Sequence, residues 1–238
     1  MKKKIALLAG GFTGESVVSL KSAAQIEEVL DYSLFEVFKI IISPESWYFQ
    51  SVDGKKIEID KNDFSINLDG EKIKFDAVFI IIHGSPGEDG KLQSYFDLLN
   101  IPYTTCDATT SALTMNKGYT KAIVNGISGL NVANSIQLFN QDESNVKEIE
   151  SQLKLPLFIK PNNGGSSIGM SKVNDWEDLQ EALDKAFAED SQILVEEFIS
   201  GREFTIGVFK SKGVTTVLPI TEIKTENEFF DFAAKYEG

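Results

Sequence analysis

The sequence predicts an α/β protein that begins with an open, mostly parallel sheet and continues into an α+β region with an antiparallel sheet. Two observations support this prediction. Through the first hundred residues, short apolar runs alternate with segments whose apolar residues recur at helical spacing, as in proteins where strands alternate with helices. After residue 190, strand-like runs follow one another with only short turns between them, which favours antiparallel pairing.

The first half of the chain supplies the alternating elements. The predicted strands are 4–10, 35–42, 75–82 and 101–105. The predicted helices are 17–30 and 92–99. The run 55–59 and the Asp69-Gly70 pair indicate an additional small hairpin. Strand, helix and strand in this order imply parallel pairing in an open sheet.

The second half predicts a different arrangement. Its helical segments are 108–126, 142–153 and 175–188. Its strand-like runs are 134–139, 155–161, 169–173, 192–198, 202–209 and 214–220, with a turn at 211–213. No helix follows the last strands before Gly238, although a sheet needs an element to bury its second face. We therefore expect this fold to be incomplete at the carboxyl end.

Composition excludes several classes of function. The formal net charge of −13 argues against a nucleic-acid-binding surface, although it permits a local basic pocket for a nucleotide. No apolar run approaches the ~18 residues of a membrane helix. Cys106 is the only cysteine and His83 the only histidine, so a disulfide is impossible and a zinc site is disfavoured. A protein of the cytoplasm is expected, because a single thiol suits a reducing compartment.

A glycine-rich loop follows the strand-like run 155–161. Lys160 comes at the end of that run, and Gly164, Gly165, Ser166 and Ser167 follow it closely. Successive backbone N–H groups in such a loop form a concave anion site, and the lysine would add a positive charge. The spacing is not that of a Walker A loop. An ordinary long hairpin turn is the alternative interpretation.

Two polar residues follow predicted parallel strands, where ligands of open sheets collect. Glu15 comes after "LAGGFTG", and His83 follows the strand 75–82. The glycine spacing departs from the dinucleotide fingerprint, which disfavours a nicotinamide or flavin enzyme. Glu15 could instead complement a helix dipole, and His83 could be a structural residue.

An acidic segment, "VEEFISGRE", connects two of the later strands. Its carboxylates are Glu196, Glu197 and Glu203, and they could hold a ribose by accepting its hydroxyl protons. A solvated strand edge is the alternative.

Six segments in this order resemble the ATP-grasp superfamily and, within it, the D-alanine–D-alanine ligase family. They are "GGFTGESVVSL", "HGSPGEDGKLQ", "IPYTTCDATTSALTMNKGYTK", "LPLFIKPNNGGSSIGMSKV", "VEEFISGREFTIGV" and "FFDFAAKY". The resemblance implies a Rossmann-like pre-ATP-grasp domain over 1–105, which would also carry a homodimer interface. It implies a central ATP-grasp subdomain over 106–199 and the start of a carboxyl-terminal subdomain over 200–238.

The same resemblance implies ATP-dependent joining of two D-alanine molecules through an acyl phosphate, for peptidoglycan precursor synthesis. The implied catalytic residues are Glu15, Ser166 and Tyr236. The implied ATP-binding residues are Lys117, Lys160, Gly165, Ser166, Ser167, Glu196, Glu197, Phe198, Ile199, Glu203 and Lys235. Glu15 and His83 would also bind the first D-alanine.

Magnesium or manganese is implied as well, with its ligands expected outside these 238 residues. The chain alone is therefore expected to be inactive. The resemblance leaves two alternatives: a ligase that joins D-alanine to D-lactate or D-serine, and a non-catalytic nucleotide-binding fragment. Lys235-Tyr236 favours the D-alanine dipeptide, because relatives that use D-lactate change this loop.

Overall fold

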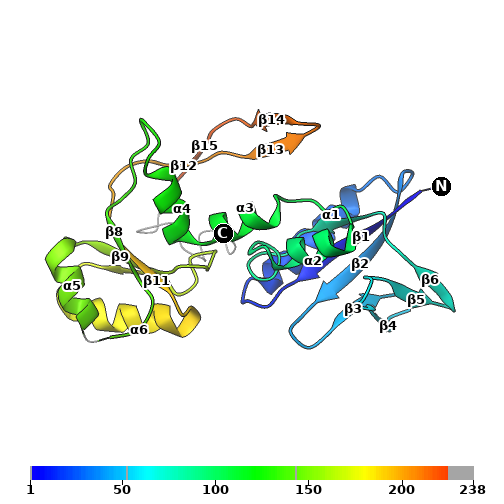
Figure 1. Ribbon diagram of the computed structural model, residues 1–238, viewed down its shortest axis with the longest axis horizontal. Coiled ribbons are helices and arrows are strands. Elements are labelled where there is room, and N and C mark those ends of the chain that lie inside the picture. Colours follow the sequence, from blue (N-terminus) through cyan, green and yellow to red (C-terminus); the bar gives the residue numbers. More distant parts are fainter. Residues whose placement is uncertain (1, 52, 143, 225–238) are drawn as a thin grey trace.

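The computed structural model describes residues 2–51, 53–142 and 144–224. Two sheet-containing regions lie side by side along the long axis of the molecule, connected by the helices α3 and α4 (Figure 1). The predicted Lys235 and Tyr236 fall outside the described residues.

The first sheet has the strand order β4-β3-β2-β1-β7. The interior strand β1 (Lys3–Gly10) pairs in parallel with β2 (Phe35–Ile42) and β7 (Ala77–Ile80). The two outer strands β3 (Trp47–Gln50) and β4 (Lys56–Glu58) are antiparallel. The parallel centre agrees with the prediction, whereas β3 was not predicted. The predicted strand 101–105 contributes only an isolated parallel bridge between Tyr103 and Val78.

Both faces of the first sheet are covered. Leu7 and Ala9 of β1 pack with Ala23 of α1 (Ser16–Val29) on one side. Ala6 and Leu8 face the opposite core, which includes side chains of α2 (Lys91–Leu99) and of the hairpin β5 (Ile66–Leu68) and β6 (Glu71–Ile73). Because both faces are buried, β1 is apolar without interruption from Ile5 to Gly10.

Two short helices connect the sheets, α3 (Ala108–Met115) and α4 (Lys117–Val124). The single helical segment predicted over 108–126 is therefore wrong. Asn116 interrupts it with an extended backbone, and its side chain accepts a hydrogen bond of 2.9 Å from the N–H of Tyr119. An asparagine side chain that satisfies a free N–H favours the start of a new helix.

The second sheet is antiparallel throughout, with the order β10-β9-β11-β8. Its strands are β8 (Ser135–Leu138), β9 (Leu157–Pro161), β10 (Ser171–Val173) and β11 (Ile193–Glu197). One face is covered by α5 (Ser144–Gln152) and by α6 (Leu179–Glu189), which the short 3-10 helix η1 (Trp176–Asp178) precedes (Figure 1). The opposite face carries Phe158, Lys160 and Glu196, and we call it the open face.

Four short strands follow in two pairs. The strand β12 (Glu203–Thr205) pairs with β15 (Thr221–Ile223), and β13 (Val208–Ser211) pairs with β14 (Val214–Val217). The predicted strand 202–209 is thus divided between β12 and β13, and the predicted strand 214–220 is shorter than expected. The predicted turn is present, since Lys212 and Gly213 have positive φ angles of 50° and 80°.

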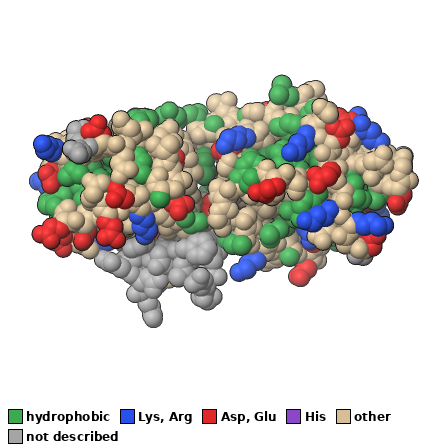
Figure 2. Space-filling view, turned by 90° about the horizontal axis from the view of Figure 1, so that it is seen from below, with side chains coloured by type: hydrophobic (Ala, Val, Ile, Leu, Met, Phe, Trp, Pro, Cys, Tyr) green, Lys and Arg blue, Asp and Glu red, His purple; other side chains and the backbone are tan. Residues whose placement is uncertain are grey.

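The molecular surface mixes charges. Basic and acidic side chains are interspersed on the face shown in Figure 2. Among the described residues, no helix is long and apolar enough to span a membrane.

Candidate active site

The glycine-rich loop connects β9 to its antiparallel neighbour β10, so it is a hairpin connection whose tip reaches the other half of the molecule. Ser166 and Ser167 have positive φ angles of 52° and 60°. A Cβ atom at Gly165 would lie 2.8 Å from Oε1 of Glu15, so a side chain at this position would displace the carboxylate. The hydroxyl of Ser166 donates a 2.5 Å hydrogen bond to the same oxygen.

Glu15 occupies the N-cap position of α1 but makes no capping hydrogen bond with its side chain. The residue is only 4% exposed. Its carboxylate is instead turned to Ser166, 151 positions later in the sequence. The structure therefore brings together Glu15, Gly165 and Ser166, which were all predicted as site residues.

His83 follows β7 at the same carboxyl edge of the first sheet. A Cβ atom at its neighbour Gly84 would lie 2.7 Å from Oε2 of Glu15, so this segment adjoins the Glu15 carboxylate. The Nε2 atom of His83 is buried and has no hydrogen-bond partner among the described residues. A buried ring nitrogen without a partner is unusual, and a polar ligand would satisfy it.

Lys117 is the first residue of α4, and its ammonium group points to the glycine-rich loop. Its Nζ donates to the carbonyl oxygens of Gly164 and, at 3.5 Å, of Asn162. Burial, together with the nearby charge of Lys160, lowers the pKa of Lys117 to about 8.

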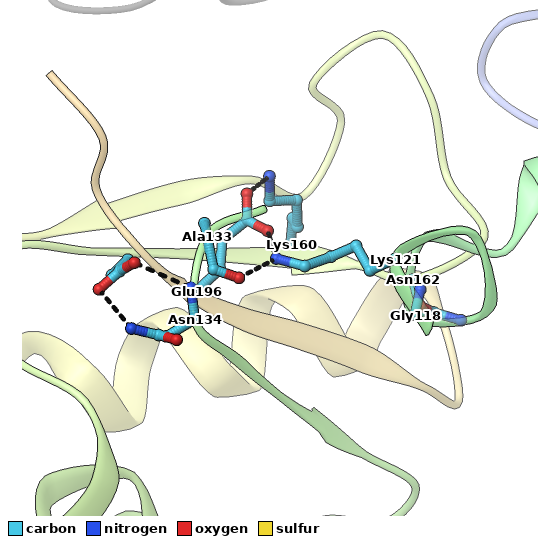
Figure 3. Close-up of polar contacts among 8 residues, drawn as sticks. Gly118, Lys121, Ala133, Asn134, Lys160, Asn162 and Glu196 are labelled. Atoms are coloured by element: carbon cyan, nitrogen blue, oxygen red, sulfur yellow. Dashed lines mark hydrogen bonds and ion pairs between the residues drawn. The ribbon is translucent and has the colours of Figure 1, made fainter. Parts of the chain in front are cut away.

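Lys160 and Glu196 of the open face form a group of three charged side chains with Lys121 of α4 (Figure 3). Nζ of Lys160 donates to Oε1 of Glu196, and Nζ of Lys121 lies 2.9 Å from Oε2 of the same carboxylate. Burial raises the pKa of Glu196, but the two lysines outweigh this effect, and the net shift is downward. Glu196 is therefore an ionised carboxylate held by two cations.

Asn162 fixes the end of β9 against α4. It is fully buried, and its Oδ1 accepts a 2.9 Å hydrogen bond from the N–H of Gly118 (Figure 3). Its Nδ2 donates to Gln192, and its carbonyl accepts from the N–H of Lys117. Asn162 and Lys121 were not assigned roles from the sequence. The doubled asparagine of "KPNNGG" was the available signal for Asn162.

The remaining predicted residues of this segment are Glu197, the last residue of β11, and Phe198 and Ile199, which follow it. Both carboxylate oxygens of Glu197 accept hydrogen bonds from Asn134, at 2.9 and 3.2 Å, so this side chain fixes the end of β8. The ring of Phe198 packs 5.8 Å from that of Phe158. Ile199 is 63% exposed.

One predicted residue belongs to another sheet. Glu203 begins β12 and is exposed.

Two cavities adjoin these groups. The larger, of about 570 Å³, lies between the two regions and is lined by Glu15, Met115, Tyr119, Gly165 and Ile168, among others. The smaller, of about 170 Å³, is lined by Lys117, Lys160, the tip of the glycine-rich loop and Met170. The smaller cavity brings two lysines and backbone N–H groups together, which suits an anion.

Metal-binding chemistry is not assembled among the described residues. They contain no group of three or more histidine, cysteine, aspartate or glutamate side chains that could hold a metal ion.

Comparison with known proteins identifies the family. The family described as "D-ala D-ala ligase N-terminus" matches residues 4–106, and "D-ala D-ala ligase C-terminus" matches residues 126–238. A D-alanine–D-alanine ligase of Phocaeicola vulgatus is 44% identical over the whole chain, which spans 73% of that relative's length. The chain belongs to the D-alanine–D-alanine ligase family. The family and the ligase class predicted from the sequence are therefore confirmed.

Solved structures of this family agree with the fold. The VanG D-Ala:D-Ser ligase from Enterococcus faecalis has a TM-score of 0.84 and 33% identity, with 99% of this chain and 74% of that one covered. D-alanyl-alanine synthetase A from Vibrio cholerae has a TM-score of 0.86 and 29% identity, with 99% and 71% covered. The predicted ATP-grasp architecture is confirmed by these two structures.

Proposed function

We propose that this chain carries the amino-acid and nucleotide sites for ATP-dependent ligation of two D-alanines to D-alanyl-D-alanine, a precursor of peptidoglycan. The observation that carries the proposal is the contact of the glycine-rich loop with Glu15. This contact joins a buried carboxylate beside the first sheet to the cavity beside the second sheet that Lys117 and Lys160 line. The chain's membership of the D-alanine–D-alanine ligase family supports the same proposal.

The nucleotide would lie against the open face. Lys117 and Lys160 would bind the phosphates, and the loop from Gly165 to Ser167 would add donors above them. The segment from Glu196 to Ile199 would border the adenine. The exposed Glu203 would reach the ribose only when the strands after β11 lie over the nucleotide. Lys235 stays part of the proposal from the sequence alone.

The first D-alanine would bind at the other end of the loop. The buried carboxylate of Glu15 would pair with its ammonium group, and His83 would donate or accept a hydrogen bond through Nε2. Ser166 links Glu15 to the loop, so it would orient the carboxylate. Tyr236 is proposed as a further member of this group from the family resemblance.

The reaction would proceed in two transfers. The carboxylate of the first D-alanine attacks the γ-phosphorus of ATP, the bond to ADP breaks, and an acyl phosphate forms. The amine of the second D-alanine then attacks the activated carbonyl, loses a proton and displaces inorganic phosphate. The chain's own contribution is positioning and positive charge near the phosphates, and exclusion of water by the loop. Magnesium or manganese supplies further charge neutralisation in such transfers, and we expect its ligands outside these 238 residues.

The cellular setting follows from the same proposal. Synthesis of a cell-wall precursor from ATP belongs in the cytoplasm, which agrees with the single unpaired cysteine. A homodimer through the first region remains a proposal from the family resemblance.

The test measures dipeptide and phosphate together. The protein is expressed at the full length that its gene encodes, and D-alanine-dependent release of phosphate from ATP is compared with D-alanyl-D-alanine separated by chromatography. Equal amounts of the two products are expected. Phosphate release without dipeptide, or neither product at saturating substrates, would overturn the proposal.

The identity of the second amino acid has one competing candidate, because the Enterococcus faecalis structure is that of a D-Ala:D-Ser ligase. The same assay with D-alanine and D-serine together decides between them. A predominance of D-alanyl-D-alanine is expected, since the relatives at 44% identity are D-alanine–D-alanine ligases. A predominance of D-alanyl-D-serine would assign the chain to the other specificity.

A further inference from the structure

The open face contains one carboxylate between two lysines, and only one of these lysines has a role in the proposed function. Glu196, Lys121 and Lys160 have side chains that are 16%, 18% and 19% exposed. Each lysine contacts a different oxygen of Glu196. Because these charged side chains are mostly buried, each depends on the others for neutralisation.

A conflict arises when a nucleotide binds. Phosphate oxygens would compete with Glu196 for the ammonium group of Lys160. Removing one partner from a buried ion pair is strongly destabilising, because the remaining charge is left without compensation. If Lys160 were the sole partner of Glu196, drawing it to the phosphates would weaken nucleotide binding.

Lys121 removes this conflict by its position. Its Nζ donates to Oε2 of Glu196 at 2.9 Å and to the carbonyl oxygen of Ala133 at 2.7 Å (Figure 3). The second bond anchors the ammonium group just before the start of β8. Lys121 comes from the helix that begins with Lys117, and the buried Asn162 fixes that helix against β9.

We propose that Lys121 is a positioning residue that keeps Glu196 neutralised and oriented while Lys160 moves to the nucleotide phosphates. The inference rests on the proposed function insofar as the ligand is a nucleotide. The low pKa of the Glu196 carboxyl agrees with it, since the carboxylate stays charged and needs a cation throughout. Lys121 itself contacts no phosphate in this arrangement.

The effect of removing Lys121 should depend on the phosphates of the ligand. In Lys121→Met, Lys160 is the only remaining cation on Glu196, so a ligand that draws it away binds poorly. We expect the Kd for ATP to rise at least ~tenfold, which is about 1.4 kcal/mol. Adenosine has no phosphate and should lose less than ~threefold, or about 0.7 kcal/mol. Lys121→Arg, which keeps the charge, should restore most of the ATP affinity.

The experiment is isothermal titration calorimetry of the full-length protein with ATP and with adenosine. Lys154→Met is the matched control, because it removes the same charge from an exposed position outside this group. A second set of titrations repeats both measurements in a Lys160→Met background. There, Lys121→Met should change the Kd for ATP and the Kd for adenosine by the same factor. Equal losses for ATP and adenosine in the single variant would overturn the inference, and so would an unchanged ATP affinity.

A ligand-free measurement keeps the two proposals distinguishable. Urea unfolding of Lys121→Met, Lys160→Met and the double variant should show a loss in the double variant well above the sum of the single losses, because only there is Glu196 alone. Additive losses would overturn the inference about Lys121 even if ATP binds. A wild-type protein that binds neither ATP nor adenosine, with the non-additive loss present, would overturn the proposed function and leave the shared neutralisation of Glu196 supported.

Discussion

Interior strands of the two sheets differ in the burial of consecutive residues. In β1 of the first sheet, Leu7 and Leu8 are both fully buried, because each faces a different apolar core. In β9 of the second sheet, Ile159 is fully buried under the helices while Lys160 lies on the open face. A sheet covered on both faces offers its ligands only an edge, whereas a sheet covered on one face offers them a surface.

This difference divides the proposed active site. Glu15 and His83 come from loops at the carboxyl edge of the first sheet, and Lys160 and Glu196 come from strand interiors of the second. Substitutions inside the first sheet should therefore change stability, whereas substitutions on the open face of the second should change ligand binding.

The first sheet should lose stability at either of two consecutive positions. Leu7→Ala and Leu8→Ala should each reduce the free energy of unfolding by about 2–5 kcal/mol, because each leaves a cavity in a different core. Urea unfolding followed by circular dichroism measures both. If one variant were as stable as the wild type, β1 would be buried on one face only and the contrast with β9 would fail.

In the second sheet, two consecutive positions should separate stability from binding. Ile159→Ala should lose about 2–5 kcal/mol of unfolding free energy. Lys160→Met should lose about 1 kcal/mol or less, since Lys121 still neutralises Glu196, yet raise the Kd for ATP at least ~tenfold. Urea unfolding and calorimetric titration are run on both variants. An unchanged ATP affinity in Lys160→Met would make the glycine-rich loop merely a hairpin.

At the edge of the first sheet, Glu15→Gln tests a single charge. The amide keeps the shape and can still accept a hydrogen bond from Ser166, but it cannot pair with an ammonium group. Removing one partner of a buried charge pair costs roughly 2–5 kcal/mol, so the KM for the first D-alanine should rise at least ~tenfold with little change for ATP. Steady-state kinetics on the full-length protein resolves the two D-alanine sites.

The control for this change lies on the same helix. Glu28→Gln removes one charge from an exposed position of α1 and should leave both KM values unchanged. A Glu15→Gln protein with normal kinetics and a lowered melting temperature would assign Glu15 to the helix dipole instead.

The smallest expected effect is a pH dependence at Lys117. Its pKa is lowered to about 8, and phosphate binding requires the protonated form, so ATP affinity should fall as the pH rises past 8. Between pH 7 and pH 8.5 the loss should be roughly fourfold, from the fraction of lysine that is deprotonated. Lys117→Arg stays charged over this range and should show a flat profile. A flat profile in the wild type would contradict the lowered pKa.

The comparison of the two sheets also explains what could be predicted from the sequence. The alternation of strands with helices in the first half and the successive strand-like runs after residue 190 were both readable, and the fold class followed from them. The strand β3 was missed, because "WYFQ" is too short to show a period. Asn116 was missed as a helix boundary, because the apolar spacing continues on both sides of it.

Site residues that belong to a local sequence motif could be predicted. Contacts between residues far apart in the sequence could not, because they depend on how the strands pair. The glycine-rich loop and Glu15 were identified from their motifs, but their contact crosses 151 positions. The role of Lys121 depends on Glu196, 75 positions away, which the antiparallel pairing of β11 with β8 and β9 brings beside α4. A local pattern carries no signal for such a pair.

The bond between Ser166 and Glu15 has a consequence for recombining members of this family. A chimera joined between α3 and α4 would leave both hydrophobic cores intact, since each core is built within one half. Its parts would still have to match at three places far from the junction: a carboxylate at 15, a hydroxyl at 166 and no side chain at 165. A hybrid could therefore fold normally in both halves and yet lack a working site, and compatibility between parents is better screened at this small contact than at the joint.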